Sequence, residues 1–135
     1  MAVDYSVSGQ RRWHVLVVDD EPSILMTARL IARREGWDVT TTSSPLEALD
    51  LARKIGPTVI LSDYVMPELT GPEFIAALRR SVETEGIPVV LMSGNARMDR
   101  PIDGANGFLE KPFSLSVLRS TLERAVVGEP ATPAL

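Results

Sequence analysis

The chain has 135 residues, which suits one domain with one hydrophobic core. It is 44% hydrophobic and 24% charged, as is ordinary for a globular protein, and its net charge of -4 argues against a large nucleic-acid footprint. The absence of cysteine excludes disulfides and thiolate metal sites and is compatible with the cytoplasm. No apolar run approaches the roughly 18 residues that span a bilayer, so membrane insertion is not expected.

The first half of the chain alternates apolar runs with helical periodicity. Residues 14–18 form a continuous apolar run, as expected for a strand covered on both faces. A helix is predicted to begin at Pro22 and to end at Gly36. Residues 37–41 predict a weaker strand near the sheet edge, and Ser44 is expected to cap a second helix. The expected buried stripe of that second helix is Leu46, Leu49, Ala52 and Ile55.

The second half continues the alternation. The expected elements are a strand at 58–62, a loop at 64–71, a helix from Pro72, a strand at 88–92, a short strand at 108–109 and a helix capped by Ser114. Strands that alternate with helices predict an α/β fold with a parallel sheet, right-handed crossovers and helices on both faces. Ligands of such sheets bind outside the carboxyl ends of the strands.

Polar residues follow the buried runs at these ends. Asp19 and Asp20 follow the first run, Asp63 the third, Ser93 the fourth and Lys111 the fifth. Each residue alone has an ordinary interpretation, because an Asp can cap a helix, Ser-Gly can form a turn and a Lys can be a solvated surface charge. Together, at one edge of one sheet, they favour a functional site.

The chemistry of such a cluster is specific. Neighbouring carboxylates repel one another unless a cation lies between them. Hard oxygen ligands select Mg2+, Mn2+ or Ca2+, and Mg2+ is often held by one or two carboxylates plus a phosphate. An aspartate can itself be the nucleophile that forms an acyl phosphate. A lysine and a hydroxyl nearby can hold the remaining phosphoryl oxygens.

Four segments make the chain resemble the receiver domain of two-component response regulators. They are VLVVDDEP (15–22), VILSDYVMPELTGPEF (59–74), VVLMSG (89–94) and FLEKPF (108–113). The resemblance covers residues 13–127, with flexible tails expected at 1–12 and 128–135. It implies a flavodoxin-like, doubly wound, five-stranded parallel sheet in the order 2-1-3-4-5.

The resemblance also implies a role for each site position. Asp63 is expected to be the phosphoacceptor and, with Asp20, a direct ligand of Mg2+, for which Mn2+ or Ca2+ could substitute. Asp19 is expected to act on the metal largely through water, and the main-chain carbonyl of Val65 to complete the protein's share of the metal shell.

The remaining implied roles concern the phosphoryl group. Ser93 is expected to hydrogen-bond it and Lys111 to pair with it, with a cis peptide bond between Lys111 and Pro112. Phe108 occupies the place of the family's switch aromatic.

Two positions are expected to tune the lifetime of the phosphorylated state. Val65 and Asn95 lie two residues beyond the acceptor and the hydroxyl residue, where they should flank the path of the attacking water. Val65 cannot orient that water and Asn95 can do so only weakly, so slow self-dephosphorylation is expected.

One departure from the family concerns the fourth helix. Family members have about four more residues between the positions of Ser93 and Lys111. The segment 95–106 is short, contains Pro101 and Gly104 and has few apolar residues. Pro costs roughly 3 kcal/mol and Gly about 1 kcal/mol inside a helix, so a shortened helix or irregular loop is predicted here.

These features predict a phosphorylation-dependent switch, not an enzyme, that accepts its phosphoryl group from a sensor histidine kinase or a histidine phosphotransfer domain. The output partner is unknown, and no DNA-binding segment is expected. An aspartyl-phosphate-type phosphatase is one alternative, although Val65 stands where such enzymes place a second acid. A non-phosphorylated interaction module is the other alternative.

The segment VMPELTGPEF followed by LMSGNA is more similar to receivers of hybrid sensor kinases than to those of transcription factors. The chain is therefore expected to be a single-domain regulator or a piece of a longer protein.

Overall fold

The computed structural model describes residues 12–94 and 102–128 and is built around one five-stranded parallel sheet. The strands are β1 (His14–Val18), β2 (Asp38–Thr42), β3 (Val59–Asp63), β4 (Val89–Ser93) and β5 (Gly107–Glu110). Their order is β2-β1-β3-β4-β5, which confirms the expected doubly wound, flavodoxin-like α/β fold and the edge position of β2.

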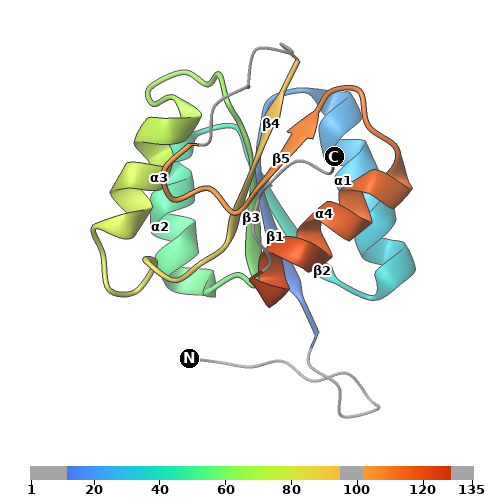
Figure 1. Ribbon diagram of the computed structural model, residues 1–135, viewed down its shortest axis with the longest axis horizontal. Coiled ribbons are helices and arrows are strands. Elements are labelled where there is room, and N and C mark those ends of the chain that lie inside the picture. The colour runs from blue at the N-terminus through green and yellow to red at the C-terminus, as the bar shows by residue number, and fades with distance from the viewer. Residues whose placement is uncertain (1–11, 95–101, 129–135) are drawn as a thin grey trace.

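Helices cover both faces of the sheet (Figure 1). They are α1 (Pro22–Glu35), α2 (Pro45–Ile55), α3 (Gly71–Arg79) and α4 (Leu115–Val127). In Figure 1, α1 and α4 lie on one side of the strands, and α2 and α3 lie on the other. As expected, Gly36 ends α1 in a left-handed conformation, and the hydroxyls of Ser44 and Ser114 cap α2 and α4.

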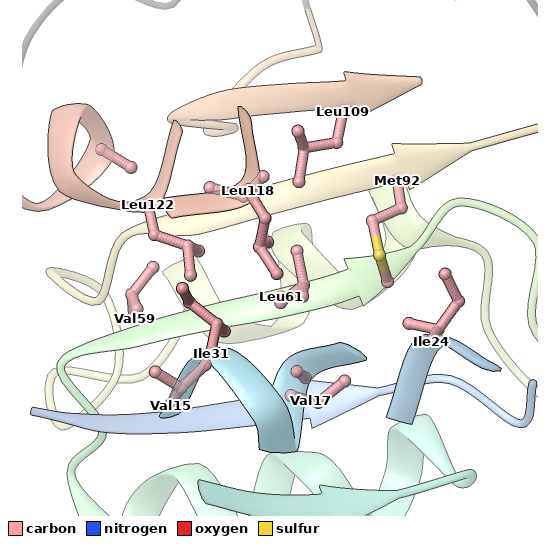
Figure 2. Close-up of a cluster of buried hydrophobic side chains, with 13 residues drawn as sticks. Val15, Val17, Ile24, Ile31, Val59, Leu61, Met92, Leu109, Leu118 and Leu122 are labelled. Carbon is pink, nitrogen blue, oxygen red and sulfur yellow. The ribbon is translucent and has the colours of Figure 1, made fainter. Parts of the chain in front are cut away.

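Alternating side chains of the strands divide the core into two layers. Val15, Val17 and Leu61 pack with α1 and α4 in the layer of Figure 2, to which α4 contributes Leu118 and Leu122. The intervening strand residues face the other way and pack with α2 and α3. Both layers are buried, which explains why the strands read as continuous apolar runs.

The second helix differs from its predicted orientation. Leu46, expected in the buried stripe, is 50% exposed, and the buried residues of α2 are Pro45, Ala48 and Ala52. The small side chains of Ala48 and Ala52 are fully buried in the α2–α3 layer of the core, whereas the larger Leu49 is only partly buried. The hydrophobic periodicity located the helix correctly but misplaced the centre of its buried stripe.

The third helix begins one residue earlier than expected, at Gly71. A capping box stabilises this start, since the Thr70 hydroxyl accepts a hydrogen bond from the backbone N–H of Glu73, and the Glu73 carboxylate accepts one from the N–H of Thr70.

The predicted irregular segment is only partly visible. Residues 95–101 lie outside the described residues, and Asn95 lies with them. Residues 102–106 contain a turn closed by a hydrogen bond from the N–H of Ala105 to the carbonyl of Ile102, 3.0 Å, and no helix. Residues 102–106 agree with the predicted irregular loop, whereas the conformation expected for the rest of the segment stays a prediction.

The limits of the domain stay a prediction. Arg12 contacts Asp38 at 3.5 Å, and Gly128 caps α4, but the rest of the expected tails lies outside the described residues. Among the described residues, no helix has the length and apolarity needed to cross a membrane.

Candidate functional site

The fold brings the predicted site residues to one edge of the sheet. Asp19 and Asp20 directly follow β1, Asp63 and Ser93 are the last residues of β3 and β4, and Lys111 directly follows β5. The parallel register places Ser62 beside Val18, Asp63 beside Met92 and Glu110 beside Ser93, so all these strands end at the same level. The convergence that the sequence predicted is a direct result of this register.

Three carboxylates form the centre of the site. One oxygen each from Asp19, Asp20 and Asp63 lies within 4.8 Å of the others. The Asp19 side chain is fully buried and that of Asp63 is 15% exposed, whereas Asp20 is exposed to solvent. An acidic donor set that is buried on one side and open on the other fits a hard divalent cation that keeps some of its water.

The Lys111 ammonium group lies among these acids. Its Nζ is 3.0 Å from Asp19 Oδ2 and 3.5 Å from Asp63 Oδ2, and it donates a further hydrogen bond to Glu21 Oε1 at 2.8 Å. Burial, the largest single influence, lowers the pKa of Lys111, but the hydrogen bonds to Glu21 and Asp19 together with the charges of Asp19 and Asp63 outweigh burial and raise it. Lys111 therefore keeps its positive charge beside Asp63.

Asp63 is in an environment that disfavours its negative charge. Desolvation and the neighbouring Asp19 charge raise its pKa, and together they outweigh Lys111 and the backbone N–H groups of Tyr64 and Val65, which lower it. The N–H of Tyr64 donates to Asp63 Oδ1 at 2.8 Å and thereby fixes the rotation of the carboxylate. A bound cation would relieve the repulsion that raises this pKa.

The other predicted residues surround this centre. Ser93 is buried, and its carbonyl accepts a 2.8 Å bond from the N–H of Lys111. The peptide bond between Lys111 and Pro112 is cis, as predicted. Phe108 is partly buried against the α2–α3 layer of the core, and Val65 is 76% exposed beside the acceptor.

Sequence reasoning missed two contributors to the site. Glu21 contacts Lys111 across 90 positions of sequence, and no local pattern indicates that pairing. Gly71 lies so close to the acceptor strand that an added Cβ would meet the Asp63 carbonyl oxygen at 3.1 Å and Leu91 Cδ2 at 2.9 Å. The Gly-Pro step at the start of a helix was a usable signal for this close approach.

Comparisons with known proteins agree with this geometry. The family model for the response regulator receiver domain matches residues 15–123. The chain is 33% identical over 121 residues to the probable transcriptional regulatory protein TcrX of Mycobacterium tuberculosis, covering 84% of this chain and 51% of TcrX. It is 35% identical over 115 residues to the sensor kinase CckA of Brucella abortus, covering 81% of this chain and 12% of CckA. The chain thus spans about half the length of TcrX and about one eighth of the length of CckA.

Solved structures give the same result. The chemotaxis response regulator CheY4 of Vibrio cholerae superposes with a TM-score of 0.77 at 33% identity, covering 84% of this chain and 98% of CheY4. The receiver domain of the sensor histidine kinase PA1611 of Pseudomonas aeruginosa, which has a magnesium ion coordinated in its active-site cleft, superposes with a TM-score of 0.77 at 25% identity, covering 86% of this chain and 98% of that domain.

Proposed function

Because this chain belongs to the response regulator receiver domain family, we propose that it is a phosphorylation-dependent signalling switch with Asp63 as the phosphoacceptor. The observation that carries the proposal is the convergence of Asp63 with two further carboxylates and the Lys111 ammonium group at the carboxyl edge of the sheet. Positioning and charge neutralisation supply most of the catalysis in phosphoryl transfer, and this cluster can contribute to both.

In the proposed reaction a carboxylate oxygen of Asp63 forms a bond to the phosphorus of a phosphohistidine. The bond from phosphorus to the imidazole nitrogen breaks, and its electron pair stays on that nitrogen. The proposed role of Lys111 is to pair with a phosphoryl oxygen, which its ion pair with Asp63 supports, and the proposed role of Ser93, the last residue of β4, is to hydrogen-bond another. Phe108, next to this edge in β5, is the proposed aromatic that responds to the movement of Ser93.

The donor set favours Mg2+, with Mn2+ or Ca2+ able to substitute. When bound, the cation supplies neutralisation of the negative charge shared by the acid and the phosphoryl group. Asp20 and Asp63 are the proposed direct ligands, with Asp19 acting largely through water and the Val65 carbonyl completing the protein's share. The burial of Asp19 and its pairing with Lys111 support its indirect role.

A phosphatase activity is less favoured by the same geometry. Hydrolysis of an aspartyl phosphate at useful rates requires a group that activates or orients water. The exposed side chain two residues after Asp63 is the apolar Val65, which offers no proton donor or acceptor. We therefore propose at most slow self-dephosphorylation. The complete set of acids and lysine also argues against a module that is never phosphorylated.

The proposed donor is a sensor histidine kinase or a histidine phosphotransfer domain, and the proposed location of the transfer is the cytoplasm. CckA shows that relatives of this chain occur within sensor kinases, and TcrX that they occur within regulators. The net charge of -4 favours an output through protein contacts rather than direct binding of DNA.

Incubation with Mg2+ and a small acyl phosphate, followed by intact-mass measurement, tests the proposal. The unaltered protein should gain one phosphoryl group, and removal of divalent cations by a chelator should prevent the gain. Asp63→Asn should abolish the gain, whereas Asp50→Asn, at a solvent-exposed acid of α2, should not alter it. A persistent adduct in Asp63→Asn would refute the assignment.

A further inference from the structure

The carboxylate of Glu21 makes the shortest ion pair of Lys111. The Nζ to Oε1 distance is 2.8 Å, compared with 3.0 Å to Asp19 and 3.5 Å to Asp63. The Lys111 ammonium group donates hydrogen bonds to Glu21 and Asp19, whereas its contact with Asp63 is an ion pair at the longer distance. Asp63, the proposed phosphoacceptor, thus makes the longest of the three contacts with Lys111.

The backbone holds Glu21 in position for this contact. Its N–H donates to Asp19 Oδ1 at 3.0 Å, and its carbonyl accepts the N–H groups of Ile24 and Leu25 at the start of α1. Asp19 therefore contacts Glu21 through one carboxylate oxygen and Lys111 through the other. The turn after β1 and the lysine after β5 form one connected unit.

Glu21 and Asp19 differ in how easily they can release the lysine. The Asp19 side chain is fully buried, so the loss of its partner would leave a desolvated charge. The Glu21 side chain is 51% exposed and can be hydrated when the ion pair opens, and such partly exposed pairs contribute little net free energy. Of the two short contacts, the one to Glu21 is the easier to exchange.

We propose that Glu21 is a positioning residue that holds Lys111 in the unphosphorylated protein and gives it up to the phosphoryl group. This inference rests on the function proposed for Asp63. While Lys111 is paired with Glu21, its charge is only partly available to an incoming phosphoryl group. Glu21 therefore slows phosphorylation and makes the resting state distinct from the phosphorylated one.

Four proteins test the proposal by their rates of phosphorylation with Mg2+ and a small acyl phosphate, followed by intact mass. They are the unaltered chain, Glu21→Gln, Glu21→Asp and Glu110→Gln. Glu21→Gln removes the charge, whereas Glu21→Asp keeps the charge but withdraws it from Lys111 by one methylene group. Glu110→Gln removes an exposed charge next to Lys111 in sequence and serves as the control for a general effect of charge on the anionic donor.

Both Glu21 variants should be phosphorylated about two- to fivefold faster, the range expected for release of a partly exposed ion pair. Glu110→Gln should behave like the unaltered chain. If Glu21→Asp keeps the original rate, or if Glu110→Gln accelerates as much as Glu21→Gln, the effect is one of charge alone and the positioning role is wrong. If the unaltered chain forms no adduct on Asp63, the proposed function itself fails, whereas an adduct that forms at one rate in all four proteins overturns only the role of Glu21.

Discussion

At the scale of single residues, the site is defined by the conflict between Asp63 and Asp19. Both carboxylates lie largely out of water, and each raises the free energy of the other's charge. Lys111 relieves part of this conflict, yet the pKa of Asp63 stays raised, with desolvation as the main cause. The resting site is therefore electrostatically strained in the absence of a cation, which is a physical reason for it to bind one.

A first prediction follows from this raised pKa. Because the folded pKa of Asp63 lies above its ordinary value of 3.8, the folded state holds the proton more tightly than the unfolded state. Protonation of Asp63 therefore contributes to the free energy of unfolding fully below pH 3.8, and this contribution is lost as the pH rises through the folded pKa. Asp63→Asn should therefore increase the free energy of unfolding near about pH 7, and the gain should shrink near about pH 3.

Urea unfolding without divalent cations measures this difference at both pH values. Asp50→Asn, whose acid is 68% exposed, provides the control and should show no comparable gain. A gain for Asp63→Asn that is equal at both pH values would contradict the electrostatic explanation.

Val65 carries a second prediction at this scale. Its exposed apolar side chain stands beside the acceptor, where a polar group could orient an attacking water. Val65→Asn should accelerate loss of the phosphoryl group severalfold, measured as the decay of the phosphorylated mass after donor removal. Val82→Asn, at an 82% exposed position after α3, should leave the decay unchanged. An unchanged rate in Val65→Asn would show that the path of water does not pass this side chain.

At the scale of elements, Arg79 connects the end of α3 to the strands that follow. Its Nη1 donates to the carbonyls of Glu85 and Ile87 at 2.8 and 2.7 Å. Its Nη2 donates to the Gly104 carbonyl at 2.6 Å and to Asn106 Oδ1 at 3.1 Å. One half-buried guanidinium group thus satisfies backbone carbonyls before both β4 and β5.

Loss of this connection should destabilise the fold. Arg79→Met would leave several part-buried carbonyls without their donor, and we expect it to lower the free energy of unfolding by about 2–4 kcal/mol. Arg80→Met removes the neighbouring exposed arginine and should change it by no more than about 0.5 kcal/mol. Urea unfolding compares the two. Equal effects would mean that the hydrogen bonds of Arg79 are replaced by water without loss.

At the scale of the whole molecule, the sheet separates the hydrophobic core into two layers. Ile31 of α1 lies in one layer and Ile75 of α3 in the other, and both are buried. The backbone of the strands lies between these layers (Figure 1). Packing changes in one layer should therefore not be relieved by repacking in the other.

This separation predicts additive effects. Ile31→Val and Ile75→Val should each lower the free energy of unfolding by about 0.5–1.5 kcal/mol, and the double variant by their sum within about 0.5 kcal/mol. Leu30→Val, on the exposed side of α1, should have a smaller effect and serves as the control. A double variant that departs from the sum by more than about 1 kcal/mol would show that the layers are coupled through the sheet.

The amino-acid sequence by itself determined the order of the elements, the class of the fold and the convergence of the predicted site residues at one edge of the sheet. Apolar runs, proline and glycine positions and caps such as Ser44 are local signals, and they placed both ends of each strand to within one residue. The site could also be predicted, because parallel strands must end at a common edge and Asp63 and Lys111 stand at strand ends.

Only the tertiary structure decided which side chains touch. The exposure of Leu46 depends on how α2 lies on the sheet, which periodicity alone does not fix. The contacts of Glu21 with Lys111 and of Arg79 with Gly104 join residues 90 and 25 positions apart, and each depends on the strand order and on where a long, flexible side chain comes to rest. A sequence pattern reports the period and polarity of neighbouring residues, whereas these pairings arise from packing between elements.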